Sequence, residues 1–115
     1  MASRRQQFDD LVLDSAARLE GRVGPRLAEV EFAVEDVPST DPAPWEHEGV
    51  PLGRAFPSVG RNQPARIVIY RRPIENRSQD QRELTAVVQD VVVEQVAALF
   101  GLNPSDLDPR YDAGD

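Results

Sequence analysis

The feature that most constrains this chain is a long apolar segment near its C-terminal end, which runs from Glu83 to about Phe100. Its paired and tripled valines, Val87-Val88 and Val91-Val92-Val93, favour a strand by propensity. Its length favours a helix, because strands usually span about 3–10 residues. Apolar residues surround most of the helical axis, so we predict a largely buried central helix with Gly101 just after its end.

Two shorter segments show the patterns that are typical of strands. Residues 29 to 37 alternate between acidic and apolar side chains, which suits a half-buried strand. Residues 66 to 70 form a compact apolar strand that Arg71-Arg72-Pro73 should end. The intervening residues 38 to 64 are rich in proline and predict a long loop, with one short strand around Val50 to Leu52.

Helices are predicted on both sides of these strands. The first spans about residues 4 to 21, with Ser3 and Gln6 as a capping box, and a second capping box at Ser78 and Gln81 precedes the central helix. Asn103-Pro104 begins a short last helix that reaches about Leu107. The sequence therefore predicts an α+β fold in a single domain over residues 1–109, followed by a flexible tail over residues 110–115.

Composition removes several function classes. The net charge is −7, with 20 acidic against 13 basic residues, which argues against binding to nucleic acid or to an anionic membrane. Cysteine is absent, so thiolate chemistry and disulfides are excluded. No apolar run reaches the roughly 18 residues of a membrane helix, and the basic start has no apolar signal region after it. We expect a cytoplasmic address.

The order of the motifs resembles a known family. Arg66-Ile-Val-Ile-Tyr-Arg-Arg-Pro-Ile-Glu75 is followed by Val91-Val-Val-Glu-Gln-Val-Ala-Ala-Leu-Phe-Gly101, and Phe8 to Leu11, Glu48 to Leu52 and Asp106-Leu107 add to the match. This set resembles the minimal zincin-like metallopeptidases of bacteria, sometimes called minigluzincins. The resemblance implies a minimal zincin-like domain with an N-terminal helix, a small mixed β-sheet, a long zinc-binding helix and a short C-terminal helix. It also implies zinc in the active members.

The chain departs from that family in its chemistry. With Phe100 and Gly101 aligned, Glu94-Gln95-Val96-Ala97-Ala98 replaces the H-E-x-x-H motif, whose two histidines hold zinc while the glutamate activates water. Glu94 and Ala98 stand at the histidine positions and Gln95 stands at the position of the general base. The family's third ligand corresponds to Asp106, with Asp108 as the alternative. We expect no catalytic residue, no zinc and no other cofactor.

Three functions remain open. The first is an inactive zincin-like domain that binds a peptide or protein, with the peptide added to the strand of Ile67 to Tyr70 or to its neighbour. The second is a metal-dependent peptidase or hydrolase with a different ligand set: Glu94, Asp106 and His47, with Asp90 as a further oxygen donor. The third is a structural or oligomerisation role, in which part of the apolar helix between Val91 and Leu99 faces a partner.

Other side chains are expected to have structural roles and no catalytic or binding role. His47 is the single histidine, and it stands in a loop between two acids, where it is expected to be exposed. Trp45 and Tyr70 are expected in the core or at its rim. The arginines near the second strand are expected to pair with acids such as Glu75 rather than to bind nucleic acid; they are Arg66, Arg71, Arg72 and Arg77.

Overall fold

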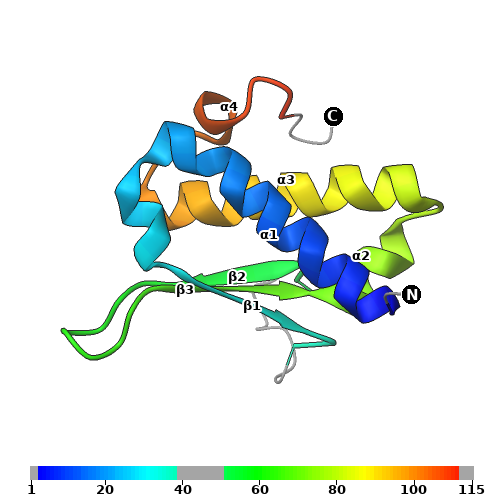
Figure 1. The fold of residues 1–115 in the computed structure, drawn as a ribbon, viewed down its shortest axis with the longest axis horizontal. Coiled ribbons are helices and arrows are strands. Elements are labelled where there is room, and N and C mark those ends of the chain that lie inside the picture. Colours follow the sequence, from blue (N-terminus) through cyan, green and yellow to red (C-terminus); the bar gives the residue numbers. More distant parts are fainter. Residues whose placement is uncertain (1–2, 39–50, 112–115) are drawn as a thin grey trace.

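The computed structural model describes residues 3–38 and 51–111 of the chain. Its helices are α1 (Arg4–Val23), the 3-10 turn η1 (Pro25–Glu29), α2 (Arg71–Arg77), α3 (Gln81–Phe100) and α4 (Pro104–Leu107), and its strands are β1 (Glu31–Glu35), β2 (Gly53–Phe56) and β3 (Arg66–Tyr70). Figure 1 shows α1 and α3 on one side of the sheet, with α4 farther from it. The predicted α+β fold is confirmed. No helix within the described ranges is long and apolar enough to cross a membrane.

The sheet has three strands in the order β1-β3-β2. β3 lies in the centre, parallel to β1 and antiparallel to β2. Side chains alternate between the two faces of a strand, and Ile67 and Ile69 of β3 are completely buried on the face that the helices cover. The strand predicted over residues 66 to 70 is therefore confirmed, and it forms the middle of the sheet.

The two outer strands differ from the sequence-based expectation. β1 is shorter than predicted because Pro25 begins a 3-10 turn that continues to Glu29. The short strand expected around Val50 to Leu52 lies at Gly53–Phe56 instead. A proline has no N–H for a strand ladder, so Pro51 ends the loop, and Leu52 enters the sheet by accepting a 3.0 Å hydrogen bond from the Tyr70 N–H.

The first helix forms as its sequence predicts. The Ser3 hydroxyl accepts a 3.1 Å hydrogen bond from the backbone N–H of Gln6, which confirms the cap. The helix continues to Val23, two residues beyond the prediction, and ends at Gly24, whose φ of 93° suits glycine. Phe8 and Leu19 on one face of α1 are buried in the core that α1 shares with α3.

A helix that the sequence did not predict follows β3 directly. Arg71-Arg72-Pro73 does end the strand, but these residues form the first turn of α2, where proline needs no N–H donor. Arg71 then ties α2 to the end of β1, because its guanidinium donates to Asp36 at 3.1 and 3.2 Å and, within α2, to Glu75 at 3.0 and 3.2 Å. The hydrogen bond from Arg71 lowers the pKa of Asp36 below its ordinary value. The predicted pairing with Glu75 is confirmed.

The central helix α3 is also confirmed, with a different cap. Asp80 is the N-cap, and its carboxylate accepts from the Glu83 N–H at 2.8 Å, whereas Ser78 donates to the Ile74 carbonyl. The expected box at Ser78 and Gln81 was wrong because aspartate two residues later offers the stronger acceptor. Gly101 ends the helix in the left-handed conformation, as predicted. The fully buried core of α3 consists of Val88, Val91, Val92, Val93, Val96 and Ala97.

The contact between β2 and α3 gives the first test. A Cβ added at Gly53 meets Val91 Cγ1 at 3.0 Å, the Val68 carbonyl at 3.1 Å and Gln95 Cγ at 3.2 Å. Gly53→Ala should therefore destabilise the protein by about 1–3 kcal/mol through overpacking. Gly21→Ala is the control, because nothing lies within 4 Å of its added Cβ, and it should stabilise α1 by about 0.5–1 kcal/mol. Urea unfolding measures both, and equal effects would contradict the close packing.

Candidate functional site

The window Glu94 to Ala98 divides α3 between the core and the surface. Val96 and Ala97 are buried, whereas Glu94 and Ala98 are exposed and Gln95 is half-buried. Residues four apart lie on the same face of a helix, so Glu94 and Ala98 project together, away from the valine core. The helix therefore keeps the arrangement that an H-E-x-x-H motif needs, with an acid and a methyl group where that motif has imidazoles.

β2 lies directly beside this window. Gly53 lies so close to Gln95 and Val91 that a Cβ atom at this position would crowd both side chains. Among the described strands β2 has β3 on one side and no strand on the other. A peptide cannot add to β3, the first strand considered for this role, because β3 is central. Its neighbour β2 is the strand that offers an edge next to Gln95.

The register shows which backbone groups of β2 face that edge. Leu52 and Tyr70 are hydrogen-bonded partners, and β2 pairs antiparallel to β3 from Gly53 opposite Ile69 onward. Hydrogen-bonded and non-bonded pairs alternate along an antiparallel ladder. Gly53 and Ala55 therefore direct their N–H and C=O groups away from β3. These are the groups that an added strand can use.

The segment after α4 returns along the exposed face of α3. The Tyr111 hydroxyl donates a 2.6 Å hydrogen bond to Glu94 Oε2, and Gln89 Nε2 donates to Asp108 Oδ2 at 3.4 Å. Leu107 is buried between these contacts. Tyr111 packs partly buried against the core, although it belongs to the predicted tail. Glu94, at the position of a zinc ligand, therefore serves as a hydrogen-bond acceptor for a phenol.

The candidate metal ligands are not gathered into a cluster. Asp106 is exposed on α4, and the Glu94 carboxylate on α3 is engaged by the Tyr111 hydroxyl. In the same ranges no group of three or more His, Cys, Asp or Glu side chains is arranged to hold a metal ion. His47 and Trp45 lie outside the described residues, so their expected roles stay predictions.

Arg66, Arg71 and Tyr70 have the structural roles that the sequence predicts. Arg66 forms an ion pair with Glu35 at 3.6 Å, and Arg71 forms the network described above. Tyr70 is buried, and this burial raises its pKa. The apolar part of α3 is covered within the chain itself, with Leu99 half-buried, so this helix does not present the broad apolar face that oligomerisation through Val91 to Leu99 requires.

The fold has the elements of a minimal zincin-type domain: a mixed sheet with an antiparallel edge strand, and a long helix that packs beside that edge. The family model of zincin-like metallopeptidases matches residues 27–113. The chain belongs to the zincin-like metallopeptidase family. A search of curated proteins gives no match.

Zinc is the usual metal of this family, and the residues at the matching positions do not fit it. Ala98 has no donor atom, and Gln95 is a neutral amide that cannot accept a proton from a metal-bound water. Catalytic zinc sites have three protein ligands, most often including histidines. Glu94 and Asp106 supply at most two carboxylates, and Glu94 already accepts a hydrogen bond from the Tyr111 hydroxyl. No catalytic step through zinc can be derived from these side chains.

The Tyr111 contact was not predicted from the sequence, and a double-mutant cycle tests it. Tyr111→Phe and Glu94→Ala should each lower stability, and their coupling should be about 0.5–1.5 kcal/mol, as for an ordinary intramolecular hydrogen bond. Urea unfolding of the two single variants and the double variant gives this number. Tyr111→Phe paired with Glu83→Ala is the control, because Glu83 lies at the opposite end of α3 and should show no coupling. Additive effects at Tyr111 and Glu94 would argue that the bond is absent in solution.

Proposed function

We propose that this protein is a zincin-like domain that has lost its peptidase chemistry and retains a role in binding a peptide or protein segment along β2. The observation that carries the proposal is the pairing of the β2 edge at Gly53 and Ala55, which has no second strand neighbour among the described strands, with a helix face that lacks histidine ligands. An extended peptide gains main-chain hydrogen bonds at such an edge whether or not a metal is present. We place the protein in the bacterial cytoplasm on the grounds of its acidic, cysteine-free composition.

A metal-dependent hydrolase with Glu94, Asp106 and His47 is the alternative, and the contacts favour it less. The Glu94 carboxylate is held by Tyr111, and a metal at this position would have to displace that phenol. Two carboxylates and one histidine also make a weaker set for zinc than two histidines and one carboxylate. Binding without catalysis needs no such rearrangement.

Restoring the ligands tests the loss of the metal site. The purified protein should contain far less than one zinc per chain. The triple variant Glu94→His, Gln95→Glu, Ala98→His should bind about one zinc per chain, because residues four apart on α3 can grip one ion and Asp106 can complete the set. Elemental analysis after dialysis, together with competition against a chromophoric chelator, measures both proteins.

The matched control for this experiment is Ala17→His with Gly21→His, which places two exposed histidines four residues apart on α1. This pair should bind zinc more weakly than the restored site, because the cations Arg18 and Arg22 flank it and no glutamate follows its first histidine. Stoichiometric, tightly held zinc in the unmodified protein would disprove the proposed loss. A folded triple variant that binds no better than the control would show that α3 and Asp106 do not keep the ancestral geometry.

Peptide binding at β2 has a test of its own. A randomised hexapeptide library displayed on phage should yield binders, and their NMR shift changes should centre on Gly53–Phe56. Ala55→Pro should abolish this binding, because proline removes an N–H that faces the edge, while strand edges tolerate proline. Ala55→Ser keeps the N–H and should bind normally. Shift changes confined to the exposed side of α1, or equal binding by both variants, would contradict docking on β2.

A further inference from the structure

A second concave surface lies away from β2, between α1, the first half of α3 and the segment around α4. It encloses about 690 Å³, which is within the usual range for a small-molecule site. Four arginines line it: Arg18, Arg22, Arg82 and Arg110. β2 contributes nothing to this groove, so its properties do not depend on the proposed peptide-binding role. We call it the arginine groove.

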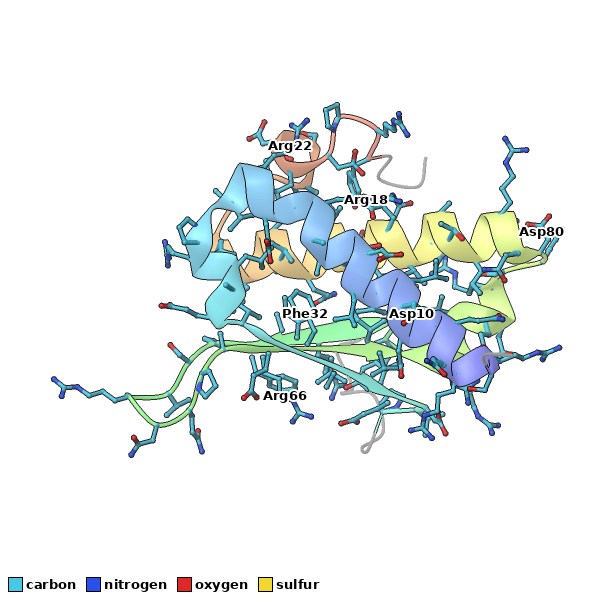
Figure 2. All side chains as sticks on the ribbon, viewed as in Figure 1. Asp10, Arg18, Arg22, Phe32, Arg66 and Asp80 are labelled. Atoms are coloured by element: carbon cyan, nitrogen blue, oxygen red, sulfur yellow. The ribbon has the colours of Figure 1, made fainter. Side chains whose placement is uncertain are left out.

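The arginines reach the groove from three separate elements. Arg18 and Arg22 are four residues apart on α1 and so share one helix face. Figure 2 shows both on the part of α1 next to α4. Arg82 begins a row on α3 that continues through Thr85, Ala86 and Gln89 at helical spacing, and Arg110 follows α4. The charge is therefore gathered by the tertiary fold and not by one basic stretch of sequence.

The charge of the groove opposes the charge of the chain. Four arginines face two aspartates, Asp90 and Asp108, so the lining carries a formal charge of +2 in a protein of net charge −7. All four arginines are exposed, and none forms an ion pair with a carboxylate in the described parts of the chain. Asp108 is engaged by Gln89 and by the Arg110 N–H at 3.0 Å. Guanidinium groups keep their charge at any physiological pH, so the groove attracts anions.

The floor of the groove adds polar and apolar contacts. Leu19 and Leu107 are buried at its base, and Thr85 and Gln89 stand beside them. Gln89 Oε1 is buried and has no hydrogen-bond partner among the described residues. The floor therefore has a polar group that the protein's own contacts leave unsatisfied.

From these observations we propose that the arginine groove binds an oligophosphate, either free or as part of a nucleotide. A guanidinium fork pairs with two oxygens of one phosphate group, so a compact monoanion can engage one or two of the four arginines. A chain of two or three phosphates spreads several negative charges over the width of the groove and can engage arginines from all three elements. The groove is bounded by α1, α3 and α4, which suits a compact ligand better than a long nucleic acid.

Calorimetric titration of the full-length protein with sodium tripolyphosphate at low salt tests this proposal. We expect one site per chain. Arg18→Gln with Arg82→Gln should weaken binding roughly tenfold or more, because each charged hydrogen-bonding group is worth that much. Arg22→Gln with Arg110→Gln should do the same. The control is Arg61→Gln with Arg77→Gln, which removes equal charge from exposed positions outside the groove.

The outcomes separate the possible ligands. Tighter binding of a nucleoside triphosphate than of tripolyphosphate would assign the groove to a nucleotide, and the reverse would assign it to free oligophosphate. Citrate, a tricarboxylate of similar charge, should bind more weakly than tripolyphosphate. Failure to bind tripolyphosphate, equal binding of citrate, or equal weakening in the control variant would each overturn the proposal. None of these results depends on zinc or on peptide binding at β2.

Discussion

The packing of α3 against the sheet is the contact on which the other features depend. The valines of α3 are buried against Ile67 and Ile69 of β3, and the absence of a side chain at Gly53 brings β2 close to the same helix. β-branched side chains have few rotamers, so a helix packed through valines is held in one orientation about its axis. That orientation determines which residues of α3 face outward. It leaves Glu94 and Ala98 exposed and sets Gln95 beside Gly53 of the edge strand β2.

Because of this division, side chains on the exposed face of α3 can be exchanged at little cost to the stability of the fold. Free energy of folding comes mainly from the buried apolar face, because each fully buried valine contributes about 1.5–3 kcal/mol relative to an exposed one. The ligand positions lie on the other face and contribute little to that burial. Burying or desolvating histidines and a glutamate around a metal also carries a cost, which alanine at position 98 does not have. Replacement of the site can therefore leave stability unchanged or improved.

The sequence predicted the elements whose patterns are long and missed those whose patterns are short. A largely apolar segment long enough for a 20-residue helix, with Gly101 after it, specifies α3 despite its valines. The apolar run of Arg66–Tyr70 is too short for such a helix and specifies a buried strand. β2 has four residues, one of them glycine, so its position depends on the partner strand and not on its own alternation. α2 was missed because Arg-Arg-Pro ends a strand and also starts a helix. Helical spacing alone predicts that Glu94 and Ala98 share one face of α3. The contact between Tyr111 and Glu94 could not be predicted, because it depends on the tertiary path of the chain after α4.

That path gives the C-terminal segment two roles at once. Tyr111 donates a hydrogen bond to Glu94 of α3. Asp108, three residues earlier, accepts a hydrogen bond from Gln89 at the floor of the arginine groove. Glu94 and Gln89 are five residues apart on one helix, so the two contacts hold the segment along a single stretch of α3. Arg110, between these contacts, contributes one of the four cations of the groove. The same few residues thus contact the exposed face of α3 at Glu94 and line the separate arginine groove.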